Sequence, residues 1–473
     1  MRIVAIDQGT TSSRAFILNG TGRGEIVATR THEQHYPHPG WVEHDPLELL
    51  RHVRECLSAT GPVDAIGIGN QGESCLGWNR KTGEPISPVI VWQDTRSEAE
   101  IANLRQDGAE VLTKARAGLP LDSYFSASKL AWILRHIPEA KTLLARGDLC
   151  LGTTDAFFLQ HLTGRAVTDI TTASRTSLMN LETGQWDADL CRVFGVPIET
   201  LPEIMPTMGD FGAAEVDGRK IPVTASVVDQ QAALFGHGCR DPGDAKITFG
   251  TGAFALALTG LALHHSPGHG LLPTVAWQQR NAAPSYALDG GVYCAASAIN
   301  WGRSLGLFSD FTEIDRFEGP SAVSRDLTFV PALAGLGSPH WDRSAAGMWL
   351  GMSLDTTSRD LMQAMLEGIA FRTGEVMQAM AAEIDLGPTI SIDGGLSANR
   401  YFCQFLADVL QKEIVPQTMT ETTSLGVARM AAGLWEKPDP RQSHKKTYHP
   451  HREQTSGIRT FAKALGRSRG WLE

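Results

Sequence analysis

The chain of 473 residues lacks the marks of several large protein classes. Its net charge of −10 argues against nucleic acid as a main partner, because such partners need a basic surface. Its longest apolar run, from Ala253 to Leu263, is too short to span a bilayer and is interrupted by Thr259 and Gly260. No leader precedes the first predicted strand, so we expect a cytoplasmic protein with no membrane span.

Cysteine is also scarce, with seven residues that form no Cys-x-x-Cys pair. Scattered cysteines in odd number are typical of thiols in a reducing compartment and not of a disulfide framework. The Walker A pattern Gly-x4-Gly-Lys-Ser/Thr is absent as well, which argues against a P-loop nucleotide site. Any nucleotide must therefore be bound in another way.

The length of the chain and its hydrophobic content of 42% predict a globular protein with two large domains, because one core cannot hold 473 residues. Predicted strands alternate with predicted helices in both halves, which indicates an α/β fold. The residues from Gly236 to Asp244 are linker-like. We therefore expect an N-terminal domain over residues 1–238 and a C-terminal domain over residues 239–473.

The stretch from Ile3 to Arg14 predicts a hairpin with an unusual tip. An apolar run ends at Asp7, and a glycine and four consecutive hydroxyl residues follow before Arg14. Backbone N–H groups and hydroxyls in such a turn can bind phosphate oxygens, and the Asp7 carboxylate can hold Mg²⁺. An ordinary solvated hairpin explains this stretch equally well when it is taken alone.

The same pattern returns near the start of the second half. A predicted strand at residues 245–249 runs into Gly250-Thr251-Gly252, and apolar residues resume at Ala253. A third turn, Asp393-Gly394-Gly395, ends another predicted strand and precedes a helix whose N-terminus favours anions. The repeated layout indicates an internal duplication.

Polar clusters follow three further predicted strands. They are Asn70-Gln71-Gly72-Glu73, Gln93-Asp94-Thr95-Arg96 and Asp229-Gln230-Gln231. Polar groups just past the carboxyl ends of strands are where open α/β sheets bind ligands. The clusters are therefore candidates for ligand binding.

The three turns together resemble the two phosphate loops and the adenosine loop of the actin-like ATPase superfamily. Four longer blocks resemble the FGGY carbohydrate kinase family, and its glycerol kinases in particular: Tyr36–Pro46, Asp169–Thr176, Asp229–Gly236 and Gly335–Asp342. The resemblance covers the chain from Ile3 to about Leu434. It implies a two-domain, ribonuclease H-like fold, with duplicated mixed sheets flanked by helices and a cleft between the domains.

The resemblance also implies roles for single residues. The implied polyol pocket consists of Gly72, Glu73, Trp92, Tyr124, Asp229, Gln230 and Phe254. The implied nucleotide site consists of Thr10, Thr11, Ser12, Arg14, Thr251, Gly252, Ala296, Asn300, Gly395 and Asn399. Asp229 would act as the general base, Asp7 would hold the metal, and the cofactors would be ATP and Mg²⁺. Ala296 and Asn300 depart from the Gly and Gln that related enzymes often carry.

Two departures bear on the substrate and its regulation. Gly72 stands where these kinases carry an arginine, so we expect weaker binding of a terminal hydroxyl and a pocket with added space. A longer polyol or a ketose, such as erythritol, threitol, xylitol or xylulose, is then an alternative substrate. The segment from Glu215 to Lys220 lacks the glycine-rich loop that binds fructose 1,6-bisphosphate in some relatives, which argues against that regulation.

We therefore predict ATP-dependent phosphorylation of a primary hydroxyl of a small polyol, with glycerol as the leading substrate and glycerol 3-phosphate as the product. An actin-like ATPase or chaperone is disfavoured, because that class lacks the polyol pocket. Each pocket residue taken alone also fits a structural role: Trp92 and Phe254 as core residues, Tyr124 as a loop cap and Asp229 as a helix N-cap. We expect a homodimer or homotetramer.

Overall fold

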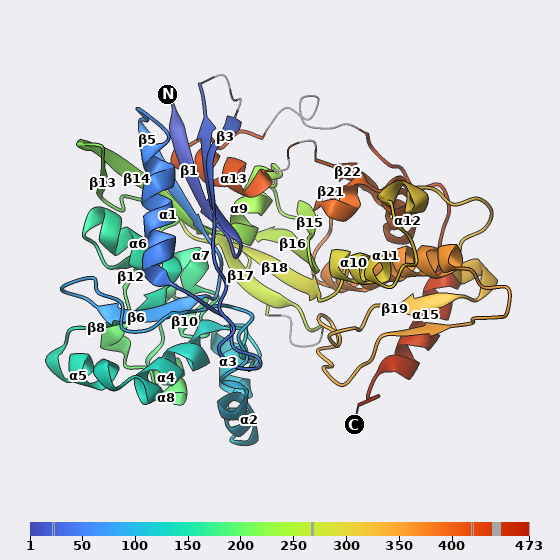
Figure 1. The fold of residues 1–473 in the computed structure, drawn as a ribbon, viewed down its shortest axis with the longest axis horizontal. Coiled ribbons are helices and arrows are strands. Elements are labelled where there is room, and N and C mark those ends of the chain that lie inside the picture. Colours follow the sequence, from blue (N-terminus) through green and yellow to red (C-terminus); the bar gives the residue numbers. More distant parts are fainter. Residues whose placement is uncertain are drawn as a thin grey trace.

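The computed structural model describes residues 1–20, 22, 24–265, 269–417, 419, 421–437 and 446–472. This part of the chain forms two lobes, each built on a six-stranded sheet with helices packed against it (Figure 1). The α/β fold predicted from the sequence is confirmed. No helix within the described ranges is long and apolar enough to cross a membrane. All seven cysteines are buried and unpaired, as the sequence predicted.

The first sheet has the strand order β13-β14-β5-β1-β2-β3. Its strands are β1 (Ile3–Gln8), β2 (Ser12–Leu18), β3 (Gly24–Thr31), β5 (Ala65–Asn70), β13 (Ala213–Val216) and β14 (Arg219–Val228). β1 runs antiparallel to β2 and parallel to β5, which in turn is parallel to β14.

The second sheet has the order β17-β18-β16-β15-β21-β22. Its strands are β15 (Ala245–Phe249), β16 (Ala253–Gly260), β17 (Leu272–Trp277), β18 (Ser285–Val292), β21 (Thr389–Gly394) and β22 (Glu413–Pro416). Five strands, in the order β18-β16-β15-β21-β22, match β3-β2-β1-β5-β14 in position and direction. The internal duplication predicted from the two hairpins is therefore present in the sheets themselves.

Shorter strands and the helices complete the fold. The remaining strands are β4 (Glu43–His44), β6 (Cys75–Asn79), β7 (Val89–Ile90), β8 (Leu149–Thr153), β9 (Val167–Asp169), β10 (Met179–Asn180), β11 (Gln185–Trp186), β12 (Glu203–Met205), β19 (Thr328–Val330) and β20 (Met348–Leu350). The helices are α1 (Pro46–Ser58), α2 (Glu98–Gln106), α3 (Glu110–Arg116), α4 (Ser126–His136), α5 (Pro138–Arg146), α6 (Thr154–Thr163), α7 (Ile170–Ala173), α8 (Ala188–Phe194), α9 (Asp229–Gly236), α10 (Ala296–Ser304), α11 (Ser358–Glu383), α12 (Arg400–Leu410), α13 (Thr422–Ala431) and α15 (Thr455–Ser468).

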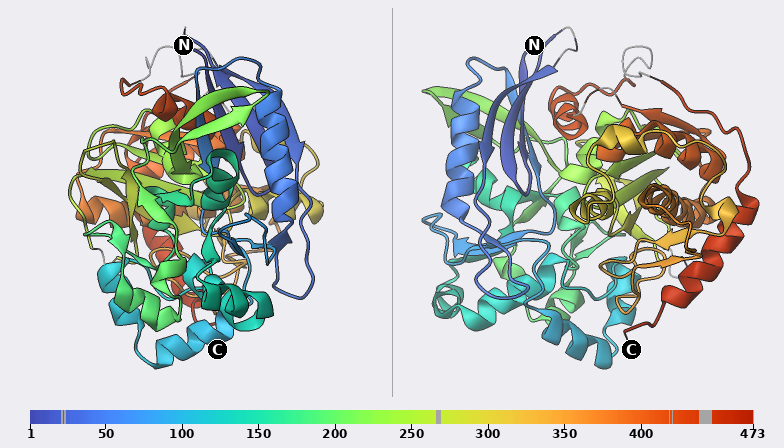
Figure 2. Two further views of the ribbon diagram at one scale, coloured as in Figure 1. Left: turned by 90° about the vertical axis from the view of Figure 1, so that its left-hand side faces the viewer. Right: turned by 45° about the vertical axis from the view of Figure 1, so that its right-hand side comes forward.

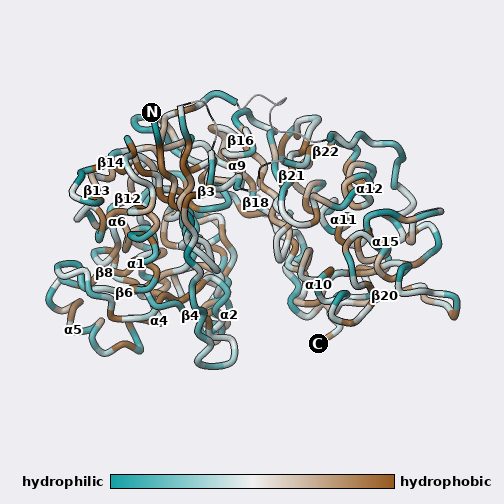
Figure 3. Tube along the Cα trace, turned by 45° about the horizontal axis from the view of Figure 1, so that its top comes forward, coloured by the Kyte–Doolittle hydropathy of each residue, from teal (hydrophilic) through white to brown (hydrophobic). Residues whose placement is uncertain are grey.

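Helices cover both faces of the first sheet, which explains why its central strands are apolar without alternation. Val4 and Ile6 pack in a core with α1 and α6, and Ile3 and Ala5 pack with α9 and α13 on the opposite face. Figure 2 shows α1 lying along this sheet, and Figure 3 shows its strands as a hydrophobic interior beneath more polar loops.

The helices α9 and α13 approach each other at two glycines. A Cβ on Gly426 would lie 1.8 Å from the carbonyl oxygen of Ala232, and a Cβ on Gly236 would lie 2.0 Å from that of Thr422. Only glycine allows the two backbones to come this close. This contact joins a helix from the end of the second half to the helix that carries Asp229, so it supports the site described below.

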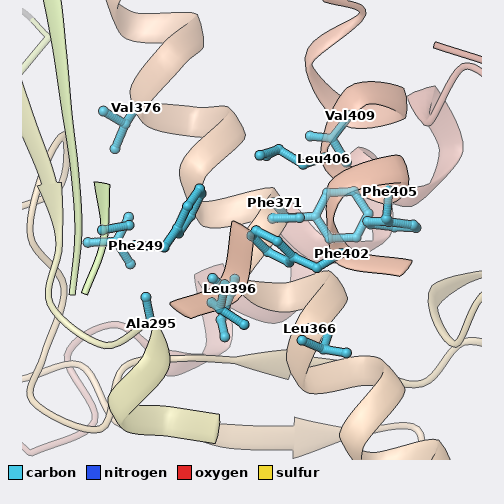
Figure 4. Close-up of a cluster of buried hydrophobic side chains, with 14 of the residues drawn as sticks. Phe249, Ala295, Leu366, Phe371, Val376, Leu396, Phe402, Phe405, Leu406 and Val409 are labelled. Atoms are coloured by element: carbon cyan, nitrogen blue, oxygen red, sulfur yellow. The ribbon is translucent and has the colours of Figure 1, made fainter. Parts of the chain in front are cut away.

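The core of the second lobe is rich in aromatic rings. Phe249 meets Phe402 edge-on at 4.9 Å between ring centroids, and Phe371 meets Phe405 in the same way at 5.3 Å (Figure 4). These contacts hold β15 against α12 and α12 against α11. The end of β15, where the second glycine-rich turn begins, is thereby anchored in a packed core.

Candidate active site

Three parallel strands deliver their polar ends to one edge of the first sheet. In the strand register Gln8 lies beside Asn70, and Asn70 lies beside Val228. The segments that follow these residues are the hairpin tip at 9–12, the loop at 71–73 and the start of α9 at 229–230. Segments far apart in the sequence therefore meet at the edge where ligands bind in open α/β sheets.

A cavity of about 90 Å³ lies at this edge. Its lining residues are Thr10, Gly72, Glu73, Trp92, Tyr124, Arg175, Val228, Asp229, Gln230, Gln231, Phe254 and Asp289. All seven residues predicted for the polyol pocket are among them, together with Thr10 of the predicted phosphate hairpin and Gln231 of the predicted polar cluster. The sequence predicted no role for the other three, which are Arg175, Val228 and Asp289. This volume lies well below the roughly 300–1,000 Å³ of sites for drug-sized ligands, so the cavity suits a small ligand.

The aromatic wall of the cavity contacts the hairpin tip directly. The indole Nε1 of Trp92 donates a hydrogen bond of 3.1 Å to Oγ1 of Thr10. The ring of Tyr124 meets that of Trp92 at 5.6 Å between centroids with an angle of 67°. This bond places the cavity next to the predicted phosphate loop.

Glu73 adopts a backbone conformation that is uncommon for a residue with a side chain. Its φ is +57°, in the left-handed region, and its side chain is buried. Ser126 Oγ donates a 3.0 Å hydrogen bond to its carbonyl, and Arg175 Nε donates one of 2.7 Å to its carboxylate. Backbone strain held in place by such bonds is a recurrent feature of ligand sites.

Arg175 supplies a guanidinium group to the cavity, although position 72 carries glycine. It lines the cavity and is only 4% exposed. Its Nη2 lies 3.1 Å from Oδ2 of Asp289. Burial alone would lower its pKa, but the carboxylates of Glu73 and Asp289 raise the pKa above its ordinary value, so Arg175 stays charged.

Val228 lies where a side chain at position 72 would begin, and the expectation that Gly72 adds space to the pocket stays a prediction. A Cβ at position 72 would stand 2.7 Å from Cγ2 of Val228. The methyl group of Val228 already occupies the start of the space that a side chain there would need.

Asp229 has the environment expected of a general base. It is the first residue of α9, whose N-cap is Val228, and its Oδ1 accepts a 2.7 Å hydrogen bond from the N–H of Gln230. Burial raises its pKa from 3.8 to about 7, with further contributions from the negative charges of Glu73 and Asp7. A pKa near the working pH is what proton abstraction from a hydroxyl requires.

Lys246 is a second residue that the sequence did not indicate. It lies on β15, is fully buried, and its Nζ donates to Oε1 of Gln230 at 2.6 Å and to Oγ1 of Thr248 at 3.0 Å. Because the amide oxygen of Gln230 accepts this hydrogen bond from the ammonium group, its amide N–H groups remain as donors towards the cavity.

The first hairpin presents the groups predicted for phosphate. Its tip is closed by a 3.0 Å bond from the Gly9 N–H to the Ser12 carbonyl, and Thr10 and Thr11 lie between them. Arg14 forms a 2.8 Å ion pair with Glu421. Asp7 is half-buried near the end of β1, and its partial removal from solvent raises its pKa to about 6.

The second turn is fixed against a helix start. The Gly250 carbonyl accepts a 3.1 Å hydrogen bond from the Ala296 N–H, and the Thr251 carbonyl accepts one of 2.9 Å from the Ala295 N–H. Asn300 lies further along α10 and is exposed. The turn is therefore held next to two of the residues predicted to surround the nucleotide.

The third turn lies beside the second. Phe249 is paired with Gly394 in the sheet, so Gly395 follows at the same edge as the 250–252 turn. Asn399 caps α12, accepting from the Phe402 N–H at 2.8 Å, and its amide donates to the Ile314 carbonyl at 2.8 Å. The side chain of Asn399 thus has a structural role, and its predicted nucleotide contact stays a prediction.

The oxygen ligands at this edge of the sheet fit a magnesium ion that is bound mainly through the phosphates of a nucleotide. Among the described residues, no three histidine, cysteine or acidic side chains gather in a group that could hold a metal on its own. Mg²⁺ in phosphoryl-transfer sites needs only one or two carboxylates, with phosphate oxygens and waters completing its shell. Asp7, half-buried near the end of β1 and next to the hairpin tip, fits this requirement.

Comparison with known proteins gives the same result for both halves of the chain. Residues 2–236 match the N-terminal domain, and residues 245–435 the C-terminal domain, of the FGGY family of carbohydrate kinases. A glycerol kinase of Thermus brockianus is 41% identical over 496 residues, which cover 100% of this chain and 99% of the relative. A glycerol kinase of Haloferax volcanii is 41% identical over 463 residues, which cover 92% and 90%.

Solved structures agree with the fold. The crystal structure of Plasmodium falciparum glycerol kinase with ADP has a TM-score of 0.90 and 30% identity, covering 99% of this chain and 98% of that one. A xylulose kinase from Rhodospirillum rubrum has a TM-score of 0.85 at 22% identity, covering 99% and 97%, which is a likeness of fold alone.

Proposed function

This chain belongs to the FGGY family of carbohydrate kinases, and we propose that it transfers the γ-phosphoryl group of ATP to a primary hydroxyl of a small polyol, with glycerol as the leading substrate. The observation that carries the proposal is the small cavity that holds Asp229 and Glu73 and is hydrogen-bonded to the phosphate hairpin through Trp92 and Thr10. A hydroxyl bound there has a base on one side and phosphate donors on the other.

Asp229 acts on the attacking hydroxyl. With its pKa raised to about 7, its carboxylate can accept the hydroxyl proton as the oxygen attacks phosphorus. Glu73 and Gln230 bind neighbouring hydroxyls, and the rings of Trp92 and Phe254 cover the C–H faces. The carboxylate and amide thereby select a polyhydroxylated substrate, and the aromatic rings exclude water.

The two glycine-rich turns hold the phosphates. Backbone N–H groups and hydroxyls of Thr10, Thr11 and Ser12, the Arg14 guanidinium and the Thr251 turn are the donors available to the transferring group. Mg²⁺, held by Asp7 and by phosphate oxygens, would neutralise charge on the phosphates. The adenosine would lie near Ala296, Asn300, Gly395 and Asn399, as the resemblance implied.

The size of the cavity supports a short polyol. Its volume lies well below that of sites for drug-sized ligands, as a short polyol requires. Val228 fills space next to Gly72, and relatives 41% identical over nearly the whole chain are glycerol kinases. We therefore expect kcat/KM to be highest for glycerol, lower for erythritol and threitol, and lowest for xylitol and xylulose.

A screen of ADP release by the purified enzyme tests this ranking. Glycerol, erythritol, threitol, xylitol and xylulose are each supplied with ATP and Mg²⁺, and kcat/KM is measured. We expect the highest value with glycerol. A higher kcat/KM with a longer polyol or a ketose would assign that compound as the substrate. If no polyol or ketose raises the rate of ADP release above the rate without polyol, an actin-like ATPase becomes the better hypothesis.

Assembly, location and regulation stay predictions. We expect a homodimer or homotetramer in the cytoplasm, and the buried, unpaired cysteines suit a reducing compartment. The segment at 215–220 forms the hairpin between β13 and β14, without a glycine-rich loop that could bind fructose 1,6-bisphosphate. Gel filtration with light scattering would establish the oligomer, and kcat measured with added fructose 1,6-bisphosphate would test the regulation.

A further inference from the structure

The guanidinium group of Arg175 has one end without a partner. Nε donates to Glu73 and Nη2 is paired with Asp289, but Nη1 is buried and makes no hydrogen bond with any residue that the structure describes. A buried charged donor without a partner is unfavourable unless a ligand or water satisfies it. Arg175 lines the cavity, so a ligand in the cavity is the available partner.

The orientation of this group is strongly fixed. Two carboxylates hold the guanidinium at its Nε and Nη2 edges, and the ring of Phe125 lies 5.6 Å from its central carbon. Glu73 in turn is held by its own backbone contact with Ser126. Such a framework leaves Nη1 pre-organised, so binding a hydroxyl there costs little side-chain freedom.

No other side chain of the cavity can supply this positive charge. Among the described residues that line it, Arg175 is the one cation. Position 72 carries no side chain, and Val228 blocks the first carbon of any replacement. The acidic residues Glu73, Asp229 and Asp289 would otherwise face a substrate with only amide and ring donors beside them.

We propose that Arg175 binds the polyol in this enzyme, donating from Nη1 to a substrate hydroxyl, and that the Gly72–Val228 pair makes the site depend on this single arginine. The proposal rests on the proposed polyol kinase activity and names the residue that determines affinity for its substrate. Asp289 is then a positioning residue, which acts through Arg175.

The variant Arg175→Lys tests the contact. Lysine keeps the positive charge but lacks the guanidinium group. A single ammonium group cannot bond Glu73 and Asp289 and also donate to the substrate in the same geometry. We expect KM for glycerol to rise roughly 10- to 100-fold, as for loss of a hydrogen bond from a charged group. KM for ATP should change by less than about threefold. Arg116→Lys, which alters an ion-paired arginine of the same lobe outside the cavity, should leave both KM values unchanged.

Deoxygenated substrates separate binding from a structural role. Propane-1,2-diol and propane-1,3-diol each lack one hydroxyl of glycerol. One of the two diols then lacks the hydroxyl that Nη1 contacts in glycerol. For that diol, Arg175→Lys and the wild-type enzyme should have nearly equal KM values. A variant that is merely misfolded or loosened would lose all three substrates alike, and this result would overturn the proposal.

A gain-of-function pair tests the Gly72–Val228 part and does not require the lysine variant to be active. Gly72→Arg alone should bind glycerol no better than wild type, because Val228 blocks the new side chain. Gly72→Arg with Val228→Ala, which removes the blocking methyl groups, should lower KM for glycerol and should restore binding when added to Arg175→Lys. A rescue by Gly72→Arg alone would refute the role of Val228.

The two levels of inference fail in different ways. If the wild-type enzyme phosphorylates none of the polyols, the proposed function fails before Arg175 is examined. If the wild-type enzyme turns over glycerol and Arg175→Lys has the same KM, the function stands and the assignment of Arg175 is wrong.

Discussion

The raised pKa of Asp229 predicts an acid limb in the pH profile that an ordinary aspartate would not give. Burial, Glu73 and Asp7 move the pKa from 3.8 to about 7, which corresponds to roughly 4 kcal/mol of preference for the neutral form. Only the ionised carboxylate can accept the hydroxyl proton. The value of kcat/KM should therefore fall about tenfold for each pH unit below about 7, and an unperturbed carboxyl would keep it level down to about pH 4.

The measurement is kcat/KM for the polyol between pH 5 and pH 9, at saturating ATP and Mg²⁺. Because ATP itself gains a proton in this range, the Glu73→Gln variant serves as the comparison. Burial is the largest cause of the raised pKa of Asp229, and the negative charge of Glu73 is the second largest. Glu73→Gln removes that charge, so the acid limb should move to lower pH. Asp229→Asn should lower kcat by about 10²- to 10⁴-fold while ADP still binds. A level wild-type profile between pH 5 and pH 8, or near-normal turnover in Asp229→Asn, would refute the assignment.

Two further predictions concern stability. Burial lowers the pKa values of His32 and His44 from 6.5 to about 4, so the folded state resists the protons that the unfolded chain accepts. Stability from these residues is complete above about pH 6.5 and falls by roughly 1.4 kcal/mol per histidine and pH unit towards pH 4. Urea unfolding at pH 7 and pH 5 should show this loss, and replacing both histidines by glutamine should reduce it. Gly426→Ala should lower Tm and cost at least about 1–3 kcal/mol, because its Cβ would lie 1.8 Å from the Ala232 carbonyl oxygen. Gly466→Ala is the matched control, since nothing lies within 4 Å of its Cβ, and it should leave Tm unchanged or raise it.

The fold could be predicted in detail because its signals are local. The strand at 245–249 has the bounds predicted from the sequence, because an apolar run ended by glycine marks it. The match between the two hairpins was visible as a repeated strand–glycine–strand pattern. Only the sheet order, which pairs strands more than 100 residues apart, shows how far the duplication extends.

The site was predicted where its residues belong to motifs and missed where they act through space. Glu73 and Asp229 follow β5 and β14, whose ends meet at one edge of the first sheet, whereas Trp92 follows β7 of another sheet. The family resemblance placed all three in one pocket before the structure was known. Arg175 lies in the Asp169–Thr176 block, but no role was predicted for it, and Lys246 lies in a strand that indicates no partner. Arg175 meets Glu73 across 102 residues of sequence, and Lys246 meets Gln230 only because β15 lies beside the start of α9.

The glycine at position 72 shows why a missing side chain is hard to interpret from sequence alone. The missing arginine side chain indicated a lost positive charge and added space in the pocket. Each of these inferences holds only if the residues around position 72 are the same as in the relatives. Here Val228 takes the space and Arg175 already carries a charge in the same cavity. The substitution at position 72 is therefore one part of an arrangement with Val228 and Arg175. Substrate preference should follow that arrangement, which is why the variants at positions 72 and 228 must be made together.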